Sequence, residues 1–157
     1  YIYSMIGLIF TLFMLGLTFG ALAIQKLAKQ GRLNFKGLVL VQLLQVIFIF
    51  FLIALVWAFS ETSPADVGVM IFLLLSITIS GVLGGMEFAL ANHLFLKKRT
   101  TLKAGTGYSI DLFGASLSSI LASAILIPLL GIPATLSMVL LINLVCFCAL
   151  LISLKTL

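Results

Sequence analysis

The feature that most constrains this chain is a series of long apolar runs, each with enough residues to cross a lipid bilayer. A helix rises about 1.5 Å per residue, so roughly 20 apolar residues cross a hydrocarbon core of about 30 Å. We therefore predict an all-α fold, a polytopic membrane bundle of five transmembrane helices that forms a single domain over residues 1–157. The predicted spans are residues 1–24, 37–59, 67–96, 107–127 and 134–154.

The composition excludes the main classes of water-soluble chain. Hydrophobic residues make up 63% of the sequence and charged residues only 8%, whereas a soluble domain carries about a quarter charged residues. Cys146 and Cys148 lie two residues apart in an apolar run, so on a helix they point to different faces and a disulfide between them is geometrically poor. We interpret both as buried structural cysteines, and an ordinary soluble fold and a disulfide scaffold are both excluded.

The connections between the runs separate the charges by sign. Residues 25–36 and 97–103 carry four cations each, whereas residues 60–66 carry two anions and no cation. Because cytoplasmic loops are enriched in Lys and Arg, we predict an N-terminus outside and a C-terminus inside. The bilayer, and not nucleic acid, is the predicted partner of these cations. The lipid-headgroup contacts predicted on this basis are Lys26, Lys29, Arg32, Lys36, Lys97, Lys98, Arg99 and Lys103.

Small residues at helical spacing predict where the spans pack against one another. Small residues four apart lie on one helix face and let two backbones approach closely. In the fourth run such residues continue at three-to-four spacing from Gly107 through Asp111 to Ala122. Two interpretations stay open for that stripe, ordinary bundle packing and the sliding surface of a transporter. The predicted packing residues are Gly16, Gly20, Gly81, Gly85, Gly114 and Ser118.

Two carboxylates, Glu87 and Asp111, lie inside predicted spans. An ionisable group there costs a few kcal/mol unless it is paired, hydrated or neutralised. Asp111 follows Gly107 by four residues, so first-turn stabilisation by the helix dipole or a bond to a neighbouring helix competes with a functional role. Glu87 lies deeper, about 15 Å along the helix from the cationic cluster. The intramembrane polar candidates, with three possible partners for Glu87 on other spans, are Glu87, Asp111, Gln42, Gln45 and Asn143.

The sequence contains no recognisable catalytic or metal-binding motif. His93 is the only histidine, and no second ligand stands at helical spacing from it. Gly105-Thr106-Gly107 precedes a membrane helix, so it is not a dinucleotide fingerprint. We therefore predict no metal, no cofactor and no catalytic residue in this chain.

Three stretches carry a family resemblance: residues 13–20, residues 84–90, and residues 107–115 continuing to 126–131. They resemble the membrane region of bacterial membrane-bound spermidine synthase-like proteins, in which spanning helices are joined to a cytoplasmic aminopropyltransferase domain. Ala89 and Ser118 depart from that pattern, standing where the family often has Pro and Gly. The resemblance implies an anchor, scaffold or subunit of a larger membrane assembly with protein partners, in the bacterial inner (plasma) membrane.

No aminopropyltransferase residue is present in this sequence, so the resemblance implies no catalytic site here and leaves the question of enzymatic activity open. The chemistry would belong to a partner chain or to a part of the polypeptide outside this sequence.

A second resemblance leads to transport. Residues 20–23 with the following cations look like the Gly-x-Leu-Ala plus basic loop of major facilitator transporters. Ile24 and Gln25 stand where an acid usually follows the Ala, and five spans are too few for that twelve-helix fold. The alternative function is a membrane transporter for protons or a small cation such as a polyamine, with Glu87 and Asp111 lining the path.

Overall fold

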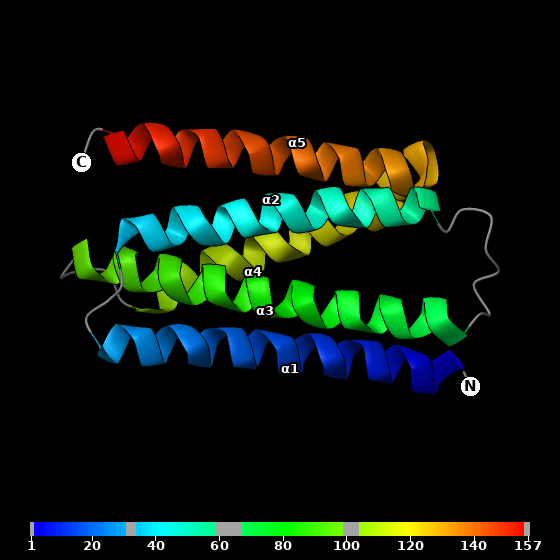
Figure 1. Ribbon diagram of the computed structural model, residues 1–157, viewed down its shortest axis with the longest axis horizontal. Helices are drawn as coiled ribbons and strands as arrows, with labels where there is room; N and C mark the ends of the chain where they lie inside the picture. The colour runs from blue at the N-terminus through cyan, green and yellow to red at the C-terminus, as the bar shows by residue number, and fades with distance from the viewer. Residues whose placement is uncertain (1, 31–33, 59–66, 99–103, 156–157) are drawn as a thin grey trace.

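A computed structural model of the protein describes residues 2–30, 34–58, 67–98 and 104–155, and nearly all of them are helical. Within these ranges only Gln30 and Asn34 lie outside helices, and no strand occurs in them. The predicted all-α class is therefore confirmed. The elements are α1 (Ile2–Lys29), α2 (Phe35–Ala58), α3 (Val67–Lys98), α4 (Ala104–Ile120), the π-helical segment η1 (Leu121–Leu126) and α5 (Ile127–Lys155) (Figure 1).

The helices form an open layer. In the described part of the chain, α1 contacts α3 alone, α3 contacts α2, and α2 contacts α5. These four elements therefore lie in the order α1, α3, α2, α5 across the layer, as Figure 1 shows. Helix α4 lies behind this layer in the same view and touches it only weakly, at α3. The face of α4 away from α3 has no neighbour among the described helices.

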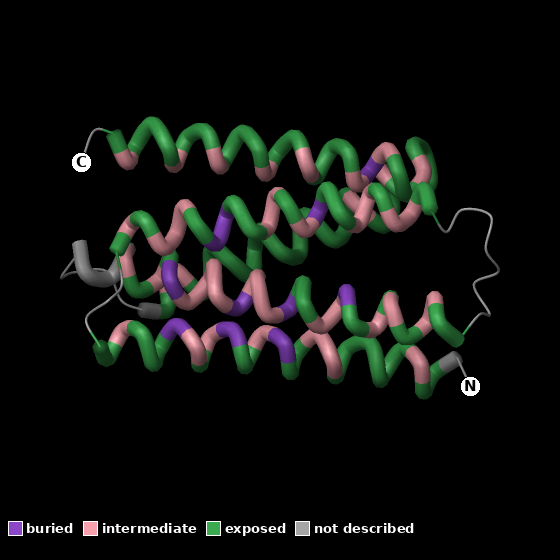
Figure 2. The backbone as a smooth tube through the Cα atoms, viewed as in Figure 1, coloured by how far each residue is buried: buried purple, intermediate pink, exposed green. Residues whose placement is uncertain are grey.

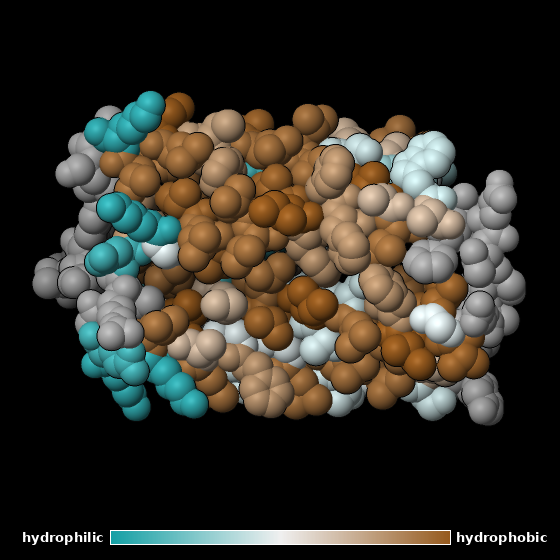
Figure 3. All heavy atoms as spheres, viewed as in Figure 1, coloured by the Kyte–Doolittle hydropathy of each residue, from teal (hydrophilic) through white to brown (hydrophobic). Residues whose placement is uncertain are grey.

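Burial is sparse and lies between the helices (Figure 2). A small apolar core joins Ile24 of α1, Val41 of α2 and Leu90 of α3, and Leu90 is only 1% exposed. Large apolar side chains cover much of the visible outer surface (Figure 3). An exposed apolar surface of this extent marks a contact with lipid or protein, because water-soluble monomers rarely show it.

By length and hydropathy, the described helices contain four candidate membrane spans and not the predicted five: Tyr3–Lys29, Phe35–Ala58, Val67–Leu94 and Gly105–Lys155. The chain therefore has the helices of a multi-pass integral membrane protein.

The difference in number arises after residue 120, where the chain stays helical. The last candidate span has 51 residues and includes residues 128–133, which the sequence predicts to be a tight turn. Inside it, Gly131 leaves the helical conformation with φ 78° and ψ 171°, values that glycine adopts far more readily than other residues. Figure 1 shows α4 and α5 running in opposite directions. The helix therefore continues to the reversal and resumes directly after it, without a non-helical loop.

The contact between α1 and α3 depends on four of the glycines singled out in the sequence. Gly16 and Gly20 of α1 face Gly81 and Gly85 of α3 across the interface. A Cβ on Gly20 would overlap the carbonyl oxygen of Val82, and the other three positions would meet backbone oxygens in the same way. The two backbones are thus in direct contact, which a larger residue at these positions would prevent.

Two other packing predictions do not match the structure. Gly114 and Ser118 are exposed, and nothing lies within 4 Å of the Cβ position of Gly114. Helix α4 meets α3 only near its own first turn, so the rest of its small-residue stripe meets no described helix. Cys146 and Cys148, interpreted above as buried, are both exposed on α5.

We predict that Gly20→Ala lowers the free energy of unfolding by about 1–3 kcal/mol, because the added methyl group meets the backbone of Val82 and Met86. Thermal or denaturant unfolding of the purified protein in lipid nanodiscs measures the change. Gly7→Ala is the matched control, since Gly7 lies on the same helix with nothing within 4 Å, and its effect should stay below about 1 kcal/mol. Equal effects of the two substitutions would contradict the proposed contact.

Candidate functional site

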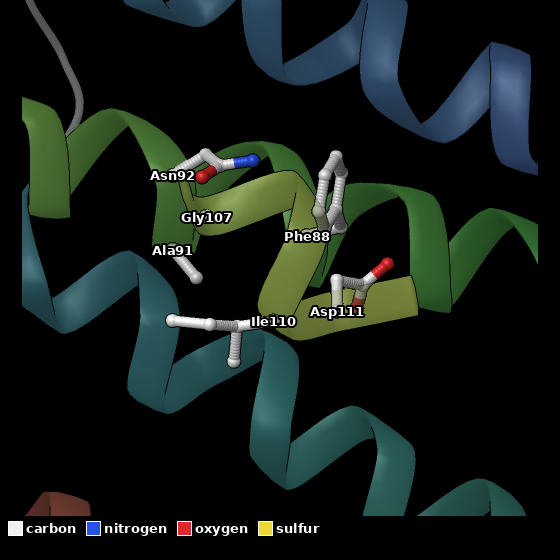
Figure 4. A pocket seen from close by; sticks show the side chains of 6 residues that line it. All are labelled: Phe88, Ala91, Asn92, Gly107, Ile110 and Asp111. Atoms are coloured by element: carbon white, nitrogen blue, oxygen red, sulfur yellow. The ribbon is translucent and has the colours of Figure 1, made fainter. Parts of the chain in front are cut away.

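A pocket lies between the last turns of α3 and the first turns of α4 (Figure 4). Residues three and four apart share one helix face, and the lining residues follow this spacing on both helices. The cavity volume is about 360 Å³. Its lining is Phe88, Ala91 and Asn92 from α3 with Gly107, Ile110 and Asp111 from α4.

Two of the lining residues, Asn92 and Gly107, are in close contact. A Cβ on Gly107 would overlap Asn92 Oδ1, so the glycine lets the amide of α3 reach the backbone of α4. Ala91, Ile110 and Asp111 are exposed. The pocket is therefore an open groove on the outer surface of the helices.

The polar groups of the pocket suit a positively charged ligand. Asp111 supplies a carboxylate and Asn92 an amide, and the ring of Phe88 lies in the same lining (Figure 4). Carboxylates and aromatic faces both attract cations. Within the described ranges, no side chain makes a hydrogen bond or an ion pair with Asp111.

Gln42 and Asn143, predicted as possible partners of Glu87, instead bind each other. The buried Gln42 Nε2 on α2 donates to Asn143 Oδ1 on α5 at 3.0 Å, with a longer approach of 3.4 Å to the Asn143 carbonyl oxygen. Asn143 Nδ2 donates to the carbonyl oxygen of Val139 at 2.9 Å. This hydrogen bond links α2 to α5, the helix at one edge of the layer.

Glu87 and Gln45 remain separate from that pair. Glu87 is half-buried on α3, four residues before Ala91, and therefore lies one helical turn deeper on the same side as the pocket. Gln45 Oε1 is buried on α2 without a hydrogen-bond partner in the described part of the chain. The structure shows no hydrogen bond from Glu87 to Gln42, Gln45 or Asn143 among these residues.

The lysines whose side chains are described stand at helix ends. Lys26 and Lys29 lie in the last turn of α1, Lys36 lies in the first turn of α2, and Lys155 lies in the last turn of α5. Hydrophilic side chains gather at that end of the molecule (Figure 3), where α3 also ends and α4 begins (Figure 1). Three other predicted headgroup contacts, Arg32, Arg99 and Lys103, lie outside the described residues. The side chains of Lys97 and Lys98 are not described either.

Sequence analysis placed Asp111 and Gly107 in one stripe but did not identify the other residues of the pocket. Phe88, Asn92 and Ile110 have no individual signal, because an aromatic, an amide and an aliphatic residue near a helix end are common in any membrane chain. No local sequence signal pairs Asn92 with Gly107, because only the fold brings the two residues together. The described residues contain no group of three or more His, Cys, Asp or Glu suited to a metal ion.

Comparison with known proteins gives no relative for this chain: no protein family, curated protein or solved structure matches it. Its function is therefore argued from the apolar helices, the pocket and the exposed surface of α4.

We predict that Asn143→Leu lowers the free energy of unfolding by about 1 kcal/mol, because it leaves the buried Gln42 amide without its acceptor. Unfolding measurements in nanodiscs on both single variants and on the Gln42→Leu/Asn143→Leu pair give the coupling energy. The pair should be less damaging than the sum of the single changes. Ser137→Ala is the control, because that hydroxyl bonds only within its own helix; strict additivity of the pair would contradict the interhelical bond.

Proposed function

We propose that this chain is the membrane-embedded subunit of a larger membrane assembly, acting as its anchor or scaffold. One observation carries the proposal: every residue of α4 and η1 from 108 to 121 is exposed. Nine of the 17 residues of α4 are Gly, Ser, Thr or Asp, a composition typical of helix contacts in membranes and not of a surface facing lipid tails. Further protein helices would cover the part of this surface that follows the pocket residue Asp111, which we call the α4 face (residues 112–121).

The open arrangement of the helices supports the same proposal. Helix α4 meets the layer only weakly, at α3, among the described elements. A helix packed on the α4 face would meet Gly114 and Ser118, whose small side chains allow close backbone approach. It would thereby use the stripe that finds no partner within this chain.

The kind of assembly that we propose is spermidine synthase-like. The support is the sequence resemblance, whose Asp111 motif lies on α4 and whose Pro-Leu-Leu-Gly stretch ends at the reversal, Gly131. An aminopropyltransferase would then be carried by a partner chain or by another part of the polypeptide.

The topology that we propose has five crossings of a bacterial inner membrane, with the N-terminus outside and the C-terminus inside. A straight helix of 51 residues would be about 76 Å long, more than twice the thickness of a hydrocarbon core of about 30 Å. The reversal at Gly131 supports two crossings by this segment. The cationic connections support the orientation through the positive-inside rule.

We predict that a photo-reactive amino acid in place of Ser118 cross-links to protein in native membranes, because the α4 face is covered there. The same amino acid in place of Phe19, which is 63% exposed on α1, should give mainly lipid adducts. Mass spectrometry of the purified adducts identifies what is attached. An adduct with an aminopropyltransferase chain would support the synthase-like assembly, and another membrane protein would support an assembly of a different kind. Lipid adducts alone at both positions would overturn the subunit proposal.

A second candidate function is transport of protons or a small cation. The observation that favours it is the position of Glu87, one turn deeper than Ala91 on the pocket side of α3, with no hydrogen bond to the described residues. Together with Asp111 it places two carboxylates at different depths along the α3–α4 region. A cation could bind to them in succession.

We predict for this candidate that Glu87→Gln abolishes proton or cation flux in proteoliposomes, because it removes the charge while keeping the size of the side chain. Ser116→Ala on α4 is the control, since its hydroxyl bonds only to the Phe113 carbonyl oxygen of its own helix; its flux should equal that of the unaltered protein. Unchanged flux in a well-expressed Glu87→Gln protein would eliminate transport through this residue.

A further inference from the structure

The α3–α4 pocket combines one anionic group with a mainly apolar lining. The Asp111 carboxylate is exposed and has no bonding partner in the described ranges. Apart from Asn92, the other lining residues are apolar or glycine. A carboxylate at this depth is costly in contact with lipid tails alone. A ligand that suits this pocket therefore carries a positive charge and also has apolar groups.

The lining also favours an ammonium group that can donate hydrogen bonds. The carboxylate of Asp111 only accepts hydrogen bonds, so it binds most strongly to a charged group that carries N–H donors. Phe88 adds an aromatic ring to the same lining (Figure 4), and aromatic faces attract ammonium groups. A primary ammonium fits these groups better than a quaternary one, because a trimethylated nitrogen has no N–H to donate.

The surroundings of the pocket indicate where such a ligand comes from. The groove opens on the exposed side of α3 and α4, which meets the bilayer in a membrane protein. The described lysines gather at the same end of the helices as the pocket (Figure 3). They disfavour a free cation but suit a headgroup that carries a phosphate beside its ammonium.

We propose that the α3–α4 pocket binds the headgroup of a zwitterionic aminophospholipid, with its ammonium on Asp111 and its phosphate toward the cationic end of the helices. The lipid neutralises the one anion of the pocket, and its acyl chains follow the exposed apolar surface of the helices. The proposal depends on insertion in a membrane and goes beyond the subunit role, since it holds whichever protein covers the α4 face.

Native mass spectrometry of the full chain tests this proposal. The protein is released from nanodiscs that contain equal amounts of phosphatidylethanolamine, phosphatidylcholine and phosphatidylglycerol, and the retained lipid is identified. We expect phosphatidylethanolamine to be retained about tenfold over the other two, the preference typical of one charge-assisted hydrogen bond. Equal retention of the three lipids would overturn the proposal.

Two variants place the binding in this pocket. Asp111→Asn removes the charge, and Ile110→Trp fills the groove from an exposed position, so each should abolish the preference for phosphatidylethanolamine. Ser116→Asn, on an exposed part of α4 outside the lining, should leave it unchanged. Thermal unfolding confirms that each variant is folded; if Asp111→Asn does not fold, Ile110→Trp decides. A preference that survives in a folded Ile110→Trp protein would overturn the site.

Addition of a water-soluble alkylamine, butylammonium, distinguishes the two sources of an ammonium group. If the bilayer supplies the ligand, butylammonium should leave the bound phosphatidylethanolamine in place. Its displacement of the lipid, in a manner that requires Asp111, would overturn the lipid as the occupant and assign the pocket to a dissolved amine.

Discussion

Hydrocarbon offers no hydrogen-bond partner to a polar group, and the structure of this chain depends on that constraint. Backbone groups are satisfied inside helices, which is why the described ranges contain almost nothing else. Hydroxyl groups follow the same rule: Thr18 and Ser123, for example, each donate to a carbonyl oxygen four residues earlier. Between helices, the Gln42 amide donates to Asn143 Oδ1, and the Asn143 amide donates to the Val139 carbonyl oxygen of its own helix. Polar atoms therefore appear where a partner is already within reach.

Helix α3 organises the rest of the molecule within this constraint. One of its faces meets α1 through Gly81 and Gly85, at backbone contact distance. A second face carries Leu90 into the small core with α1 and α2. Nearer its C-terminal end, the same helix presents Phe88 and Asn92 to α4. Since α1 touches no other described helix and α4 touches only α3 within the layer, the position of both depends on α3.

A few polar groups have no partner despite this constraint, and the functional proposals rest on them. Asp111 and the exposed stripe of α4 stand without partners in the described chain, and Gln45 Oε1 is buried without one. Additional protein helices account for the stripe, and a headgroup ammonium accounts for Asp111. These two explanations concern different parts of α4, the middle of the helix and its first turns, so each can stand without the other.

Hydrophobic runs are local signals, and the all-α class predicted from them is confirmed. The all-α class followed from the length of the apolar runs, because a helix in lipid requires no distant partner. The span count differed at residues 128–133, where Pro and Gly predicted a loop but helical structure continues to Gly131. Gly114 and Ser118 have the same spacing signal as Gly16 and Gly20, yet only the α1 pair meets a neighbouring helix.

The sequence by itself therefore determined that this protein consists of apolar helices with cations concentrated in their connections. Those properties belong to stretches of about 20 residues and need no long-range contact. Only the tertiary structure decided which faces meet: it paired Gln42 with Asn143, 101 residues apart in the chain, and brought Asn92 against Gly107. It also left α4 uncovered. The physical reason is that the residues on one helix face determine only whether that face is able to pack. Whether a neighbouring helix comes close enough to contact those residues depends on how the two helices cross.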